Sequence, residues 1–168
     1  MESMNVNTVG MRTKNKRISI YDIKSSVINA EQLGLKKLMF DVKELRPGQL
    51  SYPYHYHSDN EEMFLIIEGQ VTLRNNDEIK VLVAGDLVVF KTGEEGCHQL
   101  LNHTEDIVRY LDLSTNQDSD ICYYPDSNKI NTGSGNIFKI EEKVDYFEGE
   151  ESLPSFWDTA KTKKKYDA

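Results

Sequence analysis

Positive charge is scarce in this sequence. Its 168 residues include 20 lysines and arginines against 28 aspartates and glutamates, which gives a formal net charge of -8 at pH 7. Nucleic acids and anionic membrane surfaces are bound through a positive field, which a chain of this charge lacks. The composition therefore argues against nucleic acid and membranes as partners.

Long apolar runs are absent as well. Residues 1–20 contain no apolar stretch long enough for a signal peptide, and no later stretch approaches the length of a membrane span. We therefore expect a cytoplasmic protein. The two cysteines, Cys97 and Cys122, form no closely spaced pair of the kind that thiolate metal sites and redox motifs use, so we expect reduced thiols in packing roles.

Short strand-like segments fill the centre of the chain. They are rich in β-branched and aromatic residues, they are separated by turn residues, and no long helical period lies between them. This pattern predicts an all-β fold, a small antiparallel barrel or sandwich, in a chain of ordinary single-domain length. The expected strand segments are 37–45, 62–69, 70–75, 79–91 and 107–114.

The composition divides the chain into three regions. We expect an N-terminal extension at 1–35, the β core at 36–114, and a C-terminal extension at 115–168. Disordered tails are usually poor in aromatic residues, so we expect the aromatic tail to pack on the barrel or across a dimer, with a solvated lysine-rich end at 161–167. Tail residues of interest are Tyr123, Tyr124, Asp126, Phe138, Tyr146, Phe147, Phe156 and Trp157.

Two histidines stand one residue apart in the segment HYHSDNEEMFLIIEGQ. Side chains alternate along a strand, so His55 and His57 share one face while Tyr54 and Tyr56 share the other. Such a pair alone is weak evidence for a metal site, because histidines in strands are often ordinary surface or core residues. A third histidine, His98, follows a turn in another strand-rich segment and makes a cluster of ligands plausible.

The next strand begins with two adjacent carboxylates, of which one can face inward. The pleat favours Glu62, because it then shares a face with Phe64 and Ile66, and it leaves Glu61 as a solvated charge. His103 lies in a turn, and we expect a plain surface residue there.

These residues resemble the two motifs of the cupins. Gly48, His55, His57, Glu62 and Gly69 follow the first motif, G-x5-HxH-x3,4-E-x6-G, and Gly85, Gly93, His98 and Asn102 follow the second, G-x5-PxG-x2-H-x3-N. The chain departs from the motifs in three turns. Six residues follow Gly48 before the first histidine, Lys91 replaces the proline, and four residues separate Gly93 from the last histidine.

The resemblance implies a small double-stranded β-helix barrel, of the jelly-roll type, that holds one metal ion with His55, His57, Glu62 and His98. Three imidazoles and one carboxylate suit Fe, Mn, Ni, Co, Cu or Zn and do not choose among them. Gly69 is expected in a tight turn. The C-terminal extension is also similar to the tail of single-domain bacterial cupins of unassigned reaction, and small cupins commonly form homodimers.

Three functional readings follow from the resemblance. The first is a metalloenzyme, an oxygenase, isomerase or lyase, that acts on a small polar or carbohydrate-like molecule. The second is a non-catalytic module that binds metal and a small ligand as a sensor or store, and the third is a barrel that serves only as a scaffold. An enzyme needs an acid or base beyond the metal ligands, and the sequence places no such residue. All four ligands precede Asn116, so we expect a chain cut there to be less stable but to keep its metal.

Overall fold

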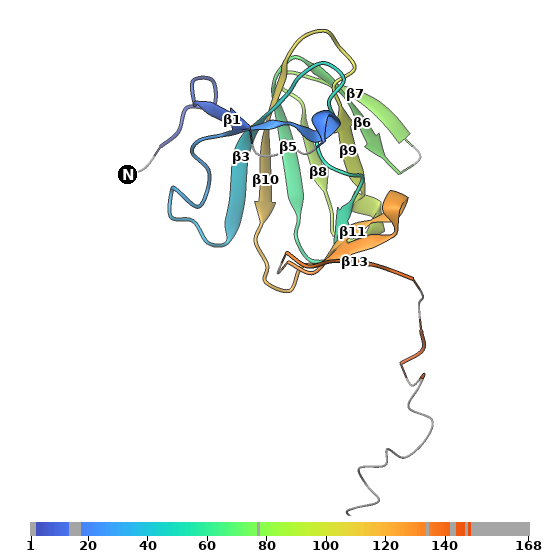
Figure 1. Ribbon diagram of the computed structural model, residues 1–168. Helices are drawn as coiled ribbons and strands as arrows, with labels where there is room; N and C mark the ends of the chain where they lie inside the picture. Colours follow the sequence, from blue (N-terminus) through green and yellow to red (C-terminus); the bar gives the residue numbers. More distant parts are fainter. Residues whose placement is uncertain are drawn as a thin grey trace, which may run out of the picture.

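The computed structural model describes residues 3–13, 18–76, 78–133, 135–141, 144–146 and 148. Within them the chain forms β-strands and three short 3-10 helices and has no α-helix (Figure 1), which confirms the predicted all-β fold. The strands are β1 (Met11–Thr13), β2 (Lys24–Ser26), β3 (Leu38–Leu45), β4 (Tyr56–His57), β5 (Glu62–Glu68), β6 (Gln70–Asn75), β7 (Glu78–Val83), β8 (Leu87–Phe90), β9 (His98–Leu101), β10 (Val108–Thr115), β11 (Cys122–Tyr124), β12 (Lys129–Asn131) and β13 (Ile137–Lys139), and the 3-10 helices are η1 (Ser19–Tyr21), η2 (Glu94–Gly96) and η3 (Pro125–Ser127).

The strands form three antiparallel sheets that enclose one core. The largest sheet has the order β1-β2-β3-β10-β5-β8, the second β7-β6-β9, and the third β13-β12-β11-β4. Figure 1 shows the β3, β10, β5 and β8 layer facing the β6, β7 and β9 layer, with β11 and β13 at the lower end. The hydrogen-bonded ladders do not close into one cylinder, so the barrel is a sandwich-like one of the jelly-roll type.

Alternating burial along β5 shows why these residues form a barrel wall. Glu62, Phe64 and Ile66 are buried, whereas the residues between them are only partly covered. Apolar side chains at such alternate positions remove one face of the strand from water, which drives the two layers together. The core includes Ile23, Leu45, Phe64, Ile66, Val71, Leu73, Leu82, Phe90, Leu100, Val108 and Tyr110.

A tight turn joins β5 to β6 at Gly69. Its φ of 83° lies in the left-handed region, and a Cβ there would stand 2.8 Å from the carbonyl oxygen of Ile107. Only glycine avoids both penalties, as the sequence predicted. None of the described helices is long and apolar enough to cross a membrane.

Both extensions contribute strands to the folded unit. The N-terminal strands β1 and β2 continue the largest sheet beyond β3, and β11 pairs with β4. Within the tail, Tyr123 and Tyr124 are partly buried, but Phe138 and Tyr146 are 52% and 87% exposed. Within its described residues, the tail therefore packs against the rest of the fold at β11, and its later aromatic side chains are exposed to solvent. Phe147, Phe156, Trp157 and the lysine-rich end lie outside the described residues.

Candidate metal centre

The four residues proposed from the sequence lie together at the mouth of the barrel. His57 belongs to β4, Glu62 begins β5, His98 begins β9, and His55 lies just before β4. The Nε2 atoms of His55, His57 and His98 are 3.9, 3.5 and 3.2 Å from Oε2 of Glu62. One carboxylate oxygen thus faces three imidazole nitrogens.

Backbone pairing fixes how the histidine strands meet. The N–H of His98 donates to the carbonyl of His55 at 2.8 Å, and the N–H of His55 donates back at 3.3 Å, which forms an isolated antiparallel bridge. The alternation predicted for this segment is confirmed, because His55 and His57 line one cavity while Tyr54 and Tyr56 line another.

Each imidazole is held by a hydrogen bond at its Nδ1 atom. The Nδ1–H of His55 donates to the carbonyl of Pro53 at 2.9 Å, and that of His98 donates to the carbonyl of Gly96 at 2.8 Å. Since a carbonyl can only accept, the proton must sit on Nδ1, and a neutral ring then carries a lone pair on Nε2. The rings are therefore fixed in the tautomer that a metal ligand requires.

The cluster leaves buried acceptors without partners. Within the described residues, Oε2 of Glu62 and Nε2 of His98 are fully covered and accept no hydrogen bond, although they stand 3.2 Å apart. Two lone pairs at this distance repel each other unless a proton or a metal cation lies between them. A divalent cation satisfies both, so the donor set fits a metal ion held through nitrogen and oxygen.

The ionisation of the cluster also suits a cation. Burial, and after it the neighbouring His98, lower the pKa of His55 to about 4, so this ring is neutral near pH 7. Burial alone raises the pKa of Glu62, but the facing histidines outweigh it and bring the pKa down to about 2. The site thus presents a neutral imidazole and an ionised carboxylate, the forms that bind metal.

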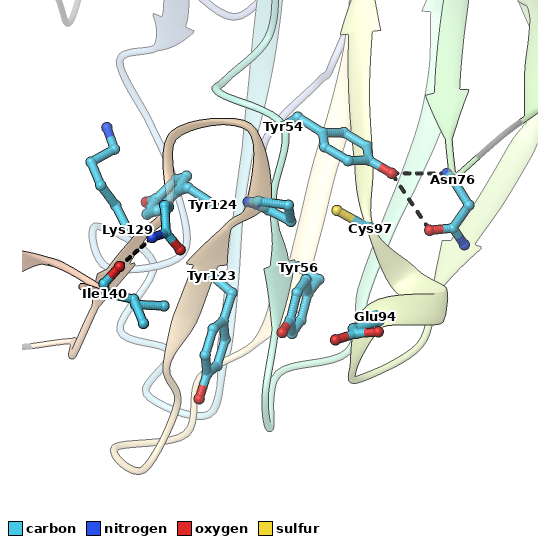
Figure 2. Close-up of a pocket in the computed structure, with 11 residues that line it drawn as sticks. Tyr54, Tyr56, Asn76, Glu94, Cys97, Tyr123, Tyr124, Lys129 and Ile140 are labelled. Carbon is cyan, nitrogen blue, oxygen red and sulfur yellow. Dashed lines mark hydrogen bonds between the residues drawn. The ribbon is translucent and has the colours of Figure 1, made fainter. Parts of the chain in front are cut away.

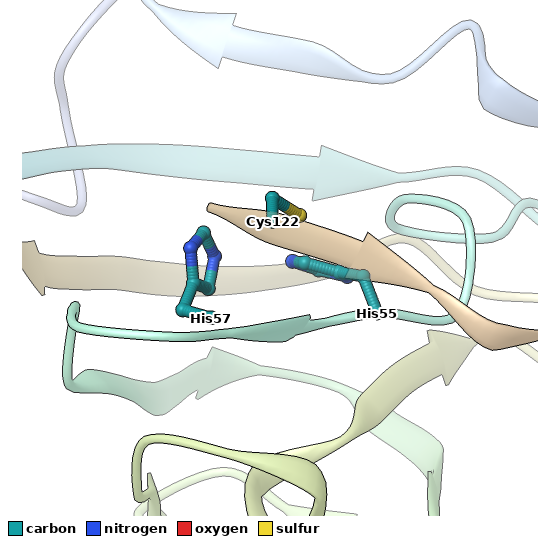
Figure 3. A group of neighbouring side chains, drawn as sticks. All are labelled: His55, His57 and Cys122. Atoms are coloured by element: carbon teal, nitrogen blue, oxygen red, sulfur yellow. The ribbon is translucent and has the colours of Figure 1, made fainter. Parts of the chain in front are cut away.

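The structure adds two residues that sequence reasoning missed, both from the C-terminal extension. Asp120 accepts a hydrogen bond from the Nδ1–H of His57 at 2.6 Å, and Cys122 lies opposite that histidine in the β4–β11 pair. Figure 3 shows the Cys122 side chain beside the rings of His55 and His57. Burial raises the pKa of Cys122 to about 12, so the thiol is protonated in the metal-free protein.

A cavity of about 350 Å³ is lined by three of the four residues, His55, His57 and Glu62. Its lining includes a buried lysine with two carboxylates: Nζ of Lys43 is 2.7 Å from Asp41 and 3.9 Å from Asp112. The same ammonium also lies over the ring of Tyr52, with Nζ of Lys43 5.3 Å from the centroid of the ring. Sequence reasoning placed no inward acid or base beyond the ligands, and these residues of β3 and β10 provide them.

The other two candidates lie where the sequence predicted. Glu61 is exposed and Glu62 is buried, as the pleat predicted. His103 is exposed as well, and its Nδ1 lies 2.6 Å from the hydroxyl of Thr72, far from any ligand contact.

A second cavity of about 410 Å³ lies on the opposite side of β4 and β11 (Figure 2). Its walls are aromatic, with the rings of Tyr56 and Tyr123 stacked at 4.8 Å, and Cys97 and Glu94 also line it. Its lining contains none of the four proposed ligands, so the candidate metal centre is at the first cavity.

The fold and the motif residues agree with comparisons to known proteins. The family model of the Cupin domain matches residues 42–114, so this part of the chain is similar to the cupin domain. The chain matches no curated protein.

Solved structures resemble the chain over most of its length. A protein from Silicibacter pomeroyi, described as a sugar phosphate isomerase of the cupin superfamily, is 21% identical with a TM-score of 0.73 and covers 86% of this chain and 98% of its own. A proposed sugar phosphate isomerase from Acidithiobacillus ferrooxidans is 23% identical with a TM-score of 0.64, over 72% of this chain and 80% of its own. At these identities the likeness demonstrates a shared fold.

Proposed function

We propose that the chain is a metal-dependent isomerase that acts on a small polyhydroxylated carbonyl compound of the sugar class. The observation that carries the proposal is one cavity whose lining includes His55, His57 and Glu62 together with a separate acid–base group around Lys43. The buried His98 lies behind this lining, 3.2 Å from Glu62. A metal ion bound by the four residues would polarise a substrate carbonyl, which makes a proton on the neighbouring carbon easier to remove.

Asp112 is the residue best suited to move that proton. Burial raises the pKa of its carboxyl well above the usual range, and the charge of Glu62 raises it further, while Lys43 opposes this. A raised pKa makes a carboxyl group a stronger base and keeps a proton available on it at higher pH, which suits a general acid or base.

Lys43 and Asp41 support this role. The Lys43 ammonium is enclosed by both aspartates, and its Nζ also lies 3.3 Å from the hydroxyl of Ser25, to which it donates. The ammonium is therefore held at a fixed position at the wall of the cavity, where it can stabilise negative charge on Asp112 or on a substrate oxygen.

The size and polarity of the cavity fit a small polar substrate. A volume of about 350 Å³ lies near the lower end of the range for small-molecule sites. Two structural neighbours are described as sugar phosphate isomerases, so sugars and their phosphates form the first panel to test. The described lining contains a single lysine, already paired with Asp41, so unphosphorylated sugars belong in the panel too.

Proton exchange in deuterated water tests the proposal. The metal-loaded protein should incorporate deuterium next to the carbonyl of at least one aldose or ketose and convert it to its isomer. Asp112→Asn should lower this rate by about 10²–10⁴-fold with metal content unchanged, while Glu94→Gln in the second cavity should have no effect. Ligand binding without exchange would instead indicate the non-catalytic binding module.

A further inference from the structure

A sulfur atom lies beside the proposed ligands. Cys122 Sγ and one ring nitrogen each from His55 and His57 all lie within 4.8 Å of one another. Two atoms on the same zinc ion are at most about 4.4 Å apart, since a Zn–N distance is about 2.1 Å and a Zn–S distance about 2.3 Å. The thiol therefore lies within a few tenths of an ångström of the distance that shared coordination needs.

Backbone pairing with β4 and with Ser58 holds Cys122 in this position. β11 pairs with β4 so that Cys122 is directly opposite His57. Just before it, the N–H of Ile121 donates to the Ser58 hydroxyl at 2.8 Å, and the N–H of Ser58 donates to the Ile121 carbonyl at 2.9 Å. The residue is buried, so the sulfur is directed at the histidines by the same ladder that places them.

Independent evidence that a cation belongs here comes from the other side of the cluster. His55 also forms a second group, with Glu62 and His98, whose ligand atoms lie within 4.8 Å of one another. In that group Oε2 of Glu62 and Nε2 of His98 are buried and accept no hydrogen bond within the described residues. His55 belongs to both groups, so the sulfur and these orphaned atoms lie around the same imidazole.

We propose that Cys122 is a fifth ligand of the metal ion, in addition to the three histidines and Glu62. This inference rests on the proposed metal centre. When the ion binds, the S–H bond breaks, a sulfur–metal bond forms and the proton leaves to solvent. A thiolate favours soft or borderline ions such as Zn(II), Co(II) and copper over Mn(II), and it occupies a position that would otherwise hold water or substrate.

Spectroscopy of the full-length protein tests this ligand directly. The Co(II)-loaded protein should show a thiolate-to-cobalt charge-transfer band, and X-ray absorption of the Zn(II)-loaded protein should show sulfur at about 2.3 Å. The chain has two cysteines, and the other one, Cys97, lines the second cavity. Cys97→Ser is therefore the matched control and should keep both signals, whereas Cys122→Ser should lose them.

Each result has a clear meaning. If the ligand-field bands of cobalt persist in Cys122→Ser, the variant is folded and binds the ion through nitrogen and oxygen. Loss of the sulfur signals in such a variant would support the proposal. If Cys122→Ser binds no ion, Cys97→Ser alone decides, since Cys122 is then its sole thiol. Metal bound without sulfur in Cys97→Ser would overturn this inference and leave the metal centre intact. A wild-type protein that binds no ion would overturn both.

Discussion

The carboxylate of Asp120 accepts a hydrogen bond from the Nδ1–H of His57 at 2.6 Å, across a sequence separation of 63 residues. Its other oxygen accepts the N–H groups of Asp59 and Asn60, at 3.0 and 3.1 Å, in the turn between β4 and β5. Burial opposes ionisation, but these donors outweigh it and lower the pKa of Asp120. One side chain thus orients a proposed ligand and fixes the turn that leads to Glu62.

Replacing Asp120 should weaken metal binding without removing any proposed ligand. Asp120→Asn keeps the shape of the side chain but loses the charge that orients the His57 ring, and residues in this role typically contribute 10–100-fold in affinity. We expect a loss of that size in a chelator competition assay. Asp126→Asn is the matched control, because Asp126 is exposed and pairs with Arg74. Equal affinities in the two variants would contradict the assigned role.

Truncation after Asn116 now has a different expected outcome from the one that the sequence suggested. The cut spares the four proposed ligands but removes Asp120 and Cys122, and it uncovers the edge of β4. We therefore expect a lower melting temperature together with weaker metal binding, measured by thermal unfolding and by metal analysis. A soluble truncated protein with the wild-type melting temperature and metal content would show that β11 is not part of the functional unit.

Acidification should destabilise the metal-free protein. His55 has a pKa of about 4 in the folded state against 6.5 as its ordinary value, so the unfolded chain binds the extra proton first. Its contribution is complete above about pH 6.5 and is lost as the pH falls towards 4; at about 1.4 kcal/mol per pKa unit it reaches roughly 3 kcal/mol. Glu62, with its lowered pKa, acts in the same direction at lower pH.

Thermal unfolding of chelator-treated protein between about pH 7 and about pH 5 measures this effect. His55→Asn should show a shallower dependence on pH than the wild type. His103→Ala, which alters an exposed histidine, should keep the full dependence. If the melting temperature changes with pH equally in the wild type and in His55→Asn, protonation of His55 does not contribute to the pH dependence of stability.

A homodimer remains the expected assembly, and the structure suggests its surface. β7 and β8 are edge strands of their sheets, and each exposes apolar side chains, among them Ile79 at 75% and Val89 at 60%. Apolar edges of this kind are normally covered by a partner. The control is Val27→Lys, because Val27 is an exposed apolar residue that follows β2 and belongs to neither edge strand. Light scattering at micromolar concentration should give twice the chain mass for the wild type and for this control, and the monomer mass for Ile79→Lys. A monomeric wild type would refute the prediction.

The sequence was a good guide where local pattern decides the structure. Each expected strand segment overlaps an observed strand. In β5 burial alternates, which leaves a period of two that is visible in the sequence. The same pleat correctly separated Glu62 from Glu61. Gly69 was also predictable, since a turn with positive φ demands glycine.

Residues brought in by long-range register were not predictable in this way. Lys43 and Asp41 look like ordinary polar positions in β3, and nothing local shows that β10 places Asp112 opposite Asp41. Asp120 and Cys122 lie in a turn-rich segment whose pairing with β4 depends on the folded barrel. A charged pair spaced by two in a mainly apolar strand is the one signal that could have identified Lys43.

A departure from the family motif also had a structural consequence that the sequence did not reveal. The additional residues between Gly93 and His98 form the 3-10 helix η2, which ends at Gly96. The carbonyl of Gly96 accepts the Nδ1–H of His98. The insertion therefore supplies the group that orients a proposed ligand.

The central claim is that His55, His57, Glu62 and His98 bind one ion, and metal analysis of the purified protein tests it most directly. Protein reloaded with Zn(II) or Co(II) and freed of excess ion should contain one ion per chain. His57→Ala should lose most of it, because one of the proposed metal–nitrogen bonds is lost, and His103→Ala should keep it. Stoichiometric metal in His57→Ala, or none in the wild type, would contradict the account.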